Sequence, residues 1–218
     1  MRGVKGTPRV LVCAGLDPSG GAGLLADLEA LAAAGARGWA VATALTAQGP
    51  RGARAVVPAA PEMLLAQVDA LLDGARDRPL AVKTGMLGSA ANAAALAARL
   101  SERPLGKVPL VVDPVLFASS GLSLLDAPDA GAALHALLAR ATLATPNWPE
   151  LEALVGRPLG SEEDAVRAAR ELPSSAVLVK GGHREGAPVD LLVRGRTVVR
   201  IAGRRRPGTA RGTGCRLA

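Results

Sequence analysis

Aromatic residues are nearly absent from this chain of 218 residues, which has two tryptophans, one phenylalanine and no tyrosine. Proteins that bind single-stranded nucleic acids stack the bases on aromatic side chains, and so few aromatics cannot form such a platform. The net charge is +7, and the densest basic run is Arg204–Arg206, with Arg211 nearby. That run suits nucleic acid or nucleotide phosphates, but a solvated loop is the simpler interpretation. We expect no nucleic-acid partner.

Cysteine and long apolar runs are scarce as well. The two cysteines, Cys13 and Cys215, give no disulfide framework and indicate a reducing compartment. No stretch approaches the roughly 18 uncharged apolar residues of a membrane span. The apolar run Val10–Leu16 is short and ends at Asp17, so we interpret it as a first strand rather than a signal peptide. We therefore expect a cytoplasmic protein with no membrane partner.

Apolar residues, by contrast, make up 49% of the chain, enough for a sizeable core. The length fits one domain, residues 1–218. Short apolar runs alternate with helical patterns, and this order predicts an α/β fold with a doubly wound, mostly parallel sheet flanked by helices. The expected strands are Arg9–Ala14, Trp39–Leu45, Leu80–Thr84, Pro109–Asp113, Thr142–Thr145 and Ala176–Lys180.

Helical spacing of apolar residues predicts helices over Leu24–Ala34 and Pro61–Leu72. A further helix is expected to begin after Ser161, where Ser161–Asp164 resembles a capping box. Near the end, 190–193 and 197–201 flank Arg194–Arg196 and are expected to form a hairpin. His135 lies in an apolar helical stretch and is interpreted as structural.

Polar residues and glycines gather just past the carboxyl ends of the expected strands, the edge at which open α/β sheets bind ligands. They are Asp17, Gln48, Lys83–Gly85, Asp113, Asn147 and Lys180–His183. The combination of carboxylate, amide, ammonium and glycine predicts a ligand site at this edge.

Most of these residues also have a structural interpretation. The loop Gly15–Gly23 matches neither a Walker loop nor a strict dinucleotide motif, and Asp17 is equally a turn former. Asn147 can cap a helix with Glu150 at its third position, or the two can lie near a hydrated magnesium ion or a nucleotide. Lys180 ends a buried strand, where its charge suits a phosphate or an ion pair with Asp113.

Two further features carry chemistry. A buried carboxylate such as Asp113 needs a cation or a metal, which favours a functional role. The turn Gly212–Cys215 aims backbone N–H groups at one point, which makes an anion site at a helix N-terminus. Such a position lowers the pKa of a cysteine thiol, so Cys215 could act as a base beside a phosphate. A hydrolytic pair of Cys215 with His183 lacks a third member, and the cysteines and His183 do not have zinc-site spacing.

Taken together, seven segments resemble the hydroxymethylpyrimidine/phosphomethylpyrimidine kinase family of thiamine biosynthesis. They occur in the same order and extend over nearly the whole chain. They are Gly15–Gly23, Thr43–Gln48, Lys83–Gly88, Asp113–Gly121, Thr145–Glu150, Lys180–His183 and Gly212–Cys215. The resemblance implies a ribokinase-like three-layer α/β/α fold.

The resemblance also implies the site. It assigns an aminopyrimidine pocket, Mg²⁺ ligands, groups that hold ATP, and an anion hole for the γ-phosphoryl group with a base for the hydroxymethyl proton. The aminopyrimidine pocket would consist of Gly15, Asp17, Gln48, Met86 and Val115. The Mg²⁺ ligands would be Asp113 and Glu150, and the groups that hold ATP would be Asn147, Lys180 and His183. The anion hole would be formed by Gly212, Thr213 and Gly214, with Cys215 as the base. The expected activity is ATP-dependent phosphorylation of the alcohol and then of its monophosphate.

The chain departs from the family pattern in three places. Ser119 replaces a lysine, Ala210–Arg211 replaces Thr-His, and the family's helices after Cys215 are missing. A pyridoxal kinase, or a remnant that binds the pyrimidine without catalysis, are the alternative functions. The resemblance also suggests a homodimer.

Overall fold

The computed structural model describes residues 7–49, 51–73, 78–118, 121–126, 130–183, 187–204 and 217–218. The expected anion hole and base, Gly212–Cys215, lie outside these residues, and so do Ser119 and Ala210–Arg211.

Within this part of the chain, the main sheet has nine strands in the order β11-β10-β9-β8-β6-β4-β1-β2-β3. The six strands from β9 to β2 in this order run parallel, and β3, β10 and β11 pair antiparallel at the two sides. The bounds are β1 Arg9–Leu16, β2 Arg37–Gly49, β3 Gly52–Pro58, β4 Ala81–Thr84, β6 Leu110–Val112, β8 Leu143–Ala144, β9 Val177–Val179, β10 Val189–Arg194 and β11 Thr197–Ala202. The short strands β5 (Gly88–Ser89) and β7 (Leu125–Asp126) pair with each other.

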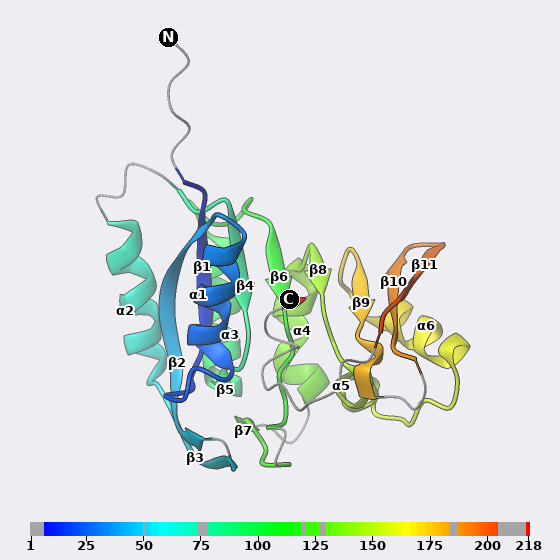
Figure 1. Cartoon of the computed structure of the whole chain (residues 1–218). Coiled ribbons are helices and arrows are strands. Elements are labelled where there is room, and N and C mark those ends of the chain that lie inside the picture. The colour runs from blue at the N-terminus through cyan, green and yellow to red at the C-terminus, as the bar shows by residue number, and fades with distance from the viewer. Residues whose placement is uncertain are drawn as a thin grey trace.

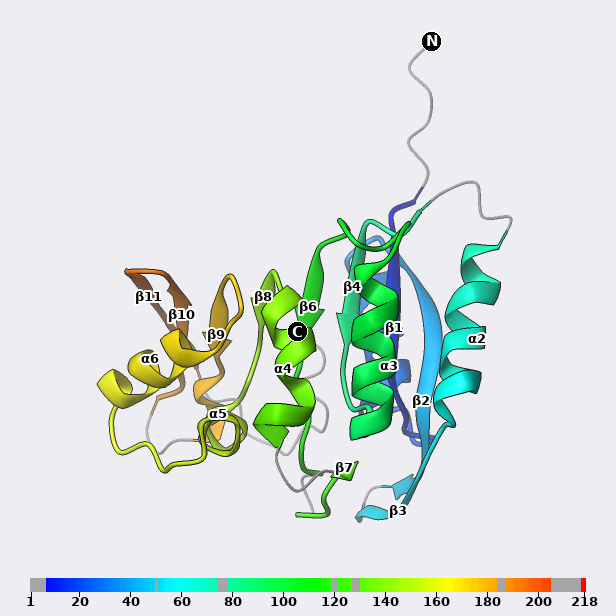
Figure 2. The ribbon, with the colours of Figure 1, turned by 180° about the vertical axis from the view of Figure 1, so that it is seen from behind.

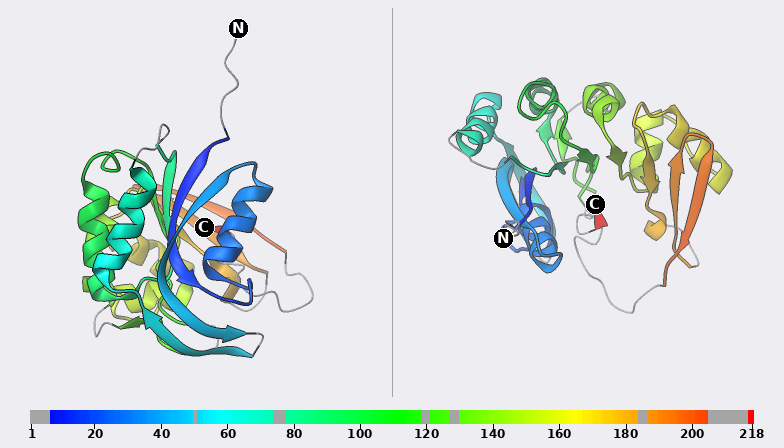
Figure 3. Two further views of the ribbon diagram at one scale, coloured as in Figure 1. Left: turned by 90° about the vertical axis from the view of Figure 1, so that its left-hand side faces the viewer. Right: turned by 90° about the horizontal axis from the view of Figure 1, so that it is seen from above.

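Helices cover the two faces of the sheet unequally. The helix α1 (Gly23–Ala33) lies in front of β1 and β2 in Figure 1. The helices on the opposite face, seen from behind in Figure 2, are α2 (Pro61–Leu72), α3 (Ala90–Ser101), α4 (Ala130–Arg140) and α6 (Glu162–Glu171). The view from above in Figure 3 separates these layers, and α5 (Trp148–Val155) packs between α4 and α6. The described elements thus form the predicted α/β layers.

The apolar runs of the sequence become the core. Leu11, Val12 and Cys13 of β1 are fully buried, as expected for a parallel strand covered on both sides. Leu96, Leu137 and the other inward residues of α3 and α4 pack on the sheet from the second face. Burying a leucine side chain stabilises the fold by roughly 1.5–3 kcal/mol. The core therefore fixes the positions of the strand ends from which the loops emerge.

All six predicted strands are present, with boundaries that differ from the prediction by at most four residues. The helices predicted at 24–34 and 61–72 and the hairpin β10–β11 are also confirmed. The predicted cap at Ser161 is confirmed, because its side chain accepts from Asp164 N and α6 begins at the next residue. One expectation needs correction, since His135 is exposed on α4 and has no core role. Strands β3, β5 and β7 were not predicted.

Candidate active site

Because the six central strands are parallel, their carboxyl ends meet at one edge of the sheet, the lower edge in Figure 1. The loops after β1, β2, β4, β6, β8 and β9 leave from this edge. The site residues predicted before position 184 lie at these strand ends, in the loops that follow them, or in the first turn of α5. The topology thus brings together segments that are up to about 165 residues apart (Gly15 to Lys180).

A buried ion pair forms the centre of the edge. Asp113 follows β6, Lys180 follows β9, and Lys180 Nζ lies 2.6 Å from Asp113 Oδ1. Thr145 Oγ1 donates a hydrogen bond of 3.2 Å to the same oxygen. Both charged side chains are almost inaccessible to water. The ion-pair interpretation of Lys180 is therefore confirmed, and it leaves a role toward phosphate open because an ammonium group has three donors.

The helix α5 brings a second carboxylate to this pair. Asn147 Oδ1 accepts from Glu150 N at 2.9 Å, and Glu150 Oε2 accepts from Asn147 N at 2.8 Å, which completes the predicted capping box. Burial raises the pKa of Glu150 from 4.5 to about 7, against the lowering effect of the Lys180 charge. The nearby charge of Asp113 raises it further. Asn147 also bridges to Lys180 between the backbones, so the cap belongs to the site.

One carboxylate oxygen of this arrangement lacks a hydrogen-bond donor within the described part of the chain. Asp113 Oδ2 is buried and accepts no hydrogen bond from any described residue. A buried carboxylate oxygen without a donor is costly, and a metal ion would satisfy it. No cluster of three or more His, Cys, Asp or Glu side chains that could hold a metal occurs among the residues described. Mg²⁺ needs no such cluster, since it is commonly held by one or two carboxylates, substrate phosphates and water. Asp113 and Glu150 fit that ion.

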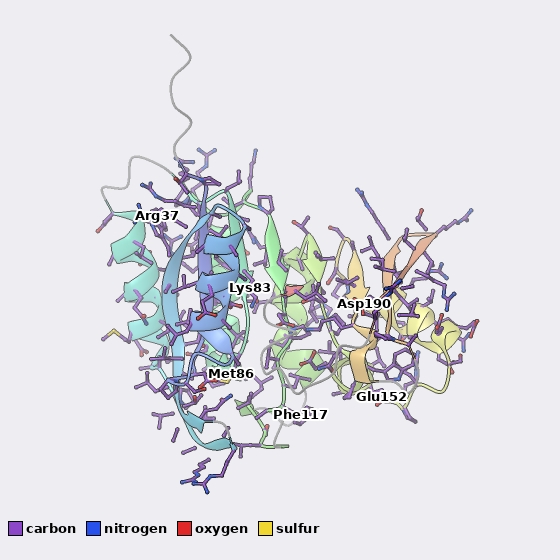
Figure 4. All side chains as sticks on the ribbon, viewed as in Figure 1. Arg37, Lys83, Met86, Phe117, Glu152 and Asp190 are labelled. Carbon is purple, nitrogen blue, oxygen red and sulfur yellow. The ribbon has the colours of Figure 1, made fainter. Side chains whose placement is uncertain are left out.

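The other half of the edge presents a more apolar surface. Gly15, the second-to-last residue of β1, lies directly against Met86, because a Cβ on Gly15 would lie 2.3 Å from Met86 Cε. A narrow hollow at the ends of β4 and β6 is lined by Thr84, Gly85, Asp113 and Val115, among others. Figure 4 labels Met86 at the lower end of the sheet, beneath α1. An apolar floor that adjoins a buried carboxylate suits a small heteroaromatic ring next to a phosphate site.

Asp17 and Gln48 border this half from two loops. Asp17 Oδ1 accepts from both the backbone N and the Oγ of Ser19, at 2.9 and 2.7 Å, so its role as a turn former is confirmed. Gln48 lies on the end of β2 and is half-buried. Thr46 Oγ1 donates to Leu16 O at 2.9 Å, which fixes the end of β2 on the end of β1. The two segments are thus held side by side.

The loop after β9 continues from Lys180 into a short 3₁₀ helix, Gly181–His183. Gly181 N donates to Asp190 Oδ1 at 2.7 Å, and a Cβ on Gly181 would lie 2.0 Å from Val189 O. Only glycine permits this close approach to β10. The side chain of His183 lies outside the described part, so its assignment to ATP stays a prediction. The same holds for Gly212, Thr213, Gly214 and Cys215.

The sequence reasoning missed a second buried ion pair and a polar network. Lys83 Nζ on β4 lies 2.7 Å from Asp27 Oδ1 on α1, and both side chains are buried. A lysine inside a buried strand was the available signal. The network joins Thr43 and Asn92 to the Met86 loop. Asn92 stands in an alanine-rich helix outside all seven segments, and no pattern marked it.

Fold and site together define a small-molecule kinase of ribokinase-like architecture. The model of a family described as phosphomethylpyrimidine kinase matches residues 17–218. The hydroxymethylpyrimidine/phosphomethylpyrimidine kinase of Rhizobium meliloti is 43% identical over 97% of this chain and 80% of its own length. The chain therefore belongs to the phosphomethylpyrimidine kinase family.

Fused relatives and solved structures agree with this assignment. The thiamine biosynthesis multifunctional protein ThiED of Corynebacterium efficiens is 41% identical over 97% of this chain, which spans only 29% of that protein. The phosphomethylpyrimidine kinase structure from Clostridium difficile superposes with a TM-score of 0.78 at 36% identity, over 89% of this chain and 84% of that one. The pyridoxal kinase of Staphylococcus aureus in complex with pyridoxal gives 0.83 at 28% identity, over 97% and 77%. Across the described residues, no helix has the length and apolar character needed to cross a membrane.

Proposed function

We propose that this chain transfers the γ-phosphoryl group of MgATP to 4-amino-5-hydroxymethyl-2-methylpyrimidine, and then to the resulting monophosphate. The observation that carries the proposal is the buried group of Asp113, Lys180, Glu150 and Asn147, at the same sheet edge as the apolar cluster around Met86. The first group suits a metal-bound polyphosphate, and the second suits a flat apolar ring. Both lie at one sheet edge, so donor and acceptor would meet there.

Phosphoryl transfer depends on positioning and on neutralising charge more than on covalent catalysis. In the proposal, Asp113 and Glu150 hold Mg²⁺, which shields the phosphate charges when bound. Lys180 places its positive charge next to the phosphates, and Asn147 fixes the loop beside them. This assignment rests on the donor chemistry of the residues and on the orphaned Asp113 Oδ2.

The acceptor would lie across Gly15 and Met86, with Val115 and Asp17 at its borders. Gln48 can donate to one ring position and accept from another through a single amide. Cys215 is proposed to take the hydroxymethyl proton in the first step. The second acceptor is already a phosphate and needs no base. One site can therefore carry out both steps.

The test incubates the 218-residue chain with MgATP and the hydroxymethylpyrimidine and follows both products by mass spectrometry. We expect the monophosphate first and the diphosphate later. A folded chain that binds the pyrimidine by calorimetry but forms neither product would overturn the proposal in favour of a non-catalytic binding protein.

Pyridoxal is the second candidate acceptor, because the likeness to the Staphylococcus aureus pyridoxal kinase reaches a TM-score of 0.83. Initial rates with pyridoxal and with the hydroxymethylpyrimidine, measured at equal concentrations and saturating MgATP, decide between them. A higher kcat/KM for pyridoxal would replace the pyrimidine assignment.

We further propose that residues 1–218 act as one domain in the cytoplasm and associate as a homodimer. The exposed pair Leu45 and Val57, which are neighbours across β2 and β3, supports an interface. Two side chains at 58% and 65% exposure on one face form an apolar surface that a second copy could cover. Sedimentation of wild type and Leu45→Lys tests this, with a monomeric variant expected.

A further inference from the structure

A buried hydrogen-bond network links the Met86 loop to β2 and α3. Thr43 Oγ1 donates to Met86 O at 2.5 Å. Asn92 Nδ2 donates to Leu87 O at 3.0 Å and to Thr43 O at 3.2 Å. Thr43 and Asn92 are both completely buried. The side chains of Thr43 and Asn92 thus donate hydrogen bonds to the consecutive carbonyl groups of Met86 and Leu87.

The loop has little freedom on its other sides. Gly88 has φ +82°, and a Cβ there would lie 3.2 Å from the Cβ atoms of Ala44 and Pro58. Met86 itself packs against Gly15, Ala44 and Leu124. Directional hydrogen bonds on one side and close packing on the other fix the height of Met86 above Gly15.

An asparagine at position 92 is unfavourable for the stability of the fold alone. Its Oδ1 is buried and accepts no hydrogen bond from any residue described. An orphaned buried acceptor destabilises the folded state, and an apolar side chain would avoid that penalty. Thr43 O has another donor as well, since Ala59 N donates to it at 2.9 Å. The bond that only Asn92 supplies, among the described residues, is the one to Leu87 O.

We infer that Thr43 and Asn92 are positioning residues for the acceptor pocket, which hold Met86 at the separation from Gly15 that the flat ring requires. The inference rests on the proposed function, because it takes Met86 as part of the acceptor pocket. Neither residue touches the acceptor. They act through the backbone of Met86 and Leu87, and small displacements of such a loop change substrate affinity strongly.

The chain offers a matched control on the same strand. Gln67 of α2 binds the backbone of Ala42, where its Oε1 accepts from the N at 2.9 Å and its Nε2 donates to the O at 3.1 Å. Like Asn92, it is a helix amide that grips β2, one residue from Thr43. None of its hydrogen bonds within the described part of the chain reaches the Met86 loop. A general role in stability would make the two amides equivalent.

The experiment compares wild type with Thr43→Val, Asn92→Ala and Gln67→Ala. Thr43→Val keeps the shape of the side chain and removes only the donor to Met86 O, so it carries the test if Asn92→Ala fails to fold. The first readout is the ¹³C-methyl signal of Met86 without substrate, which is simple because the chain has three methionines. We expect this signal to shift or broaden in Thr43→Val and Asn92→Ala and to stay in place in Gln67→Ala.

The second readout is steady-state kinetics. We expect KM for the pyrimidine to rise about tenfold in Thr43→Val and Asn92→Ala, with KM for MgATP within about twofold of wild type. An unchanged Met86 signal, or an equal effect of Gln67→Ala, would overturn the inference. If the wild-type chain does not phosphorylate the pyrimidine, the proposed function is wrong. The Met86 signal would still show whether Thr43 and Asn92 hold the loop in place.

Discussion

Lys180 Nζ lies 2.6 Å from Asp113 Oδ1, and this contact joins the ends of β9 and β6 across the intervening strand β8. The pair is buried, so the two charges interact in a medium of low dielectric. It also sits where the proposed metal and phosphates would bind. Stability and activity are therefore expected to depend on the same contact.

Lys180→Met should weaken both properties. The substitution leaves Asp113 buried without its cation, and removing one partner of a buried pair destabilises a protein by about 3–5 kcal/mol. We expect a loss near the lower value together with a large fall in kcat. Urea unfolding and initial rates measure the two effects. The control is Asp69→Asn, which breaks the more exposed pair with Arg99 (2.8 Å) and should cost less than about 1 kcal/mol.

Glu150 should make stability depend on pH. Its pKa of about 7 lies above the ordinary value of 4.5, so between these values the folded chain keeps a proton that the unfolded chain has lost. The free energy of unfolding therefore falls as pH rises from 4.5 to 7, by about 3 kcal/mol in total. Glu150→Gln removes this contribution. We expect the stability of the variant relative to wild type to increase between pH 4.5 and pH 8 in metal-free buffer.

Urea unfolding of both proteins at several pH values gives this difference directly, because all other titrating groups are shared. Parallel curves for wild type and Glu150→Gln would contradict the raised pKa. Added Mg²⁺ and nucleotide should reduce the difference, since a bound cation favours the charged carboxylate.

Gly15→Ala should damage acceptor binding more than the fold. The new Cβ would lie 2.3 Å from Met86 Cε, the far end of a flexible side chain, which must then move. We expect KM for the pyrimidine to rise about tenfold and the unfolding free energy to fall by only about 1 kcal/mol. In Gly160→Ala, where the nearest contact would be an ordinary 3.5 Å to Asp164 Oδ2, both quantities should stay near wild type. Equal effects of the two alanines would argue against a pocket at Gly15.

Cys215→Ala should separate the two phosphorylation steps. The alcohol needs a base for its proton, whereas the monophosphate does not, so the first step is expected to slow about 10²–10⁴-fold and the second far less. The substrates are supplied separately and each product is followed by mass spectrometry. Equal loss of both steps would contradict the role of Cys215 as a base.

The same variant makes Cys13 the sole remaining thiol. Burial in β1 raises the pKa of the Cys13 thiol to about 12, so almost no thiolate is present at pH 8. We expect Ellman's reagent to leave folded Cys215→Ala unmodified and to react with one thiol after urea unfolding. Rapid reaction of the folded variant would show that β1 is accessible.

Much of the parallel sheet was predictable, because its strands are continuous apolar runs that end at polar or glycine residues. Val10–Leu16 ending at Asp17 is one example, and the strand that ends before Asp113 is another. The antiparallel strand β3 was missed, since Gly52–Pro58 is mostly exposed and has no apolar alternation strong enough to mark it. Its strand character comes from pairing with β2, a tertiary effect.

Part of the site was likewise visible in sequence. Asp113 and Lys180 could be recognised in the sequence as charged residues at the ends of apolar runs, and the Asn147–Glu150 spacing predicted the capping box. Thr43 and Asn92 could not be found in this way, because threonine in a strand and asparagine near a helix start are ordinary. Only the fold shows that Asn92 reaches Leu87 O and Thr43 O. Contacts between distant segments carry no local signature.

The order of the site residues along the chain also determines when each half of the site is synthesised. Every residue assigned to the acceptor half lies between Gly15 and Val115, and the nucleotide half begins at Asp113, so strand β6 ends where the two halves meet. Lys180 follows Val115 by 65 residues, so a ribosome that adds about 5–20 residues per second needs roughly 3–13 seconds to reach it. During that interval the residues assigned to the acceptor half have been synthesised, while Lys180 has not. A nascent chain therefore contains its proposed pyrimidine-binding residues before its full set of proposed ATP-binding residues. Asp113 acquires its ion-pair partner only when Lys180, which follows β9, has been synthesised.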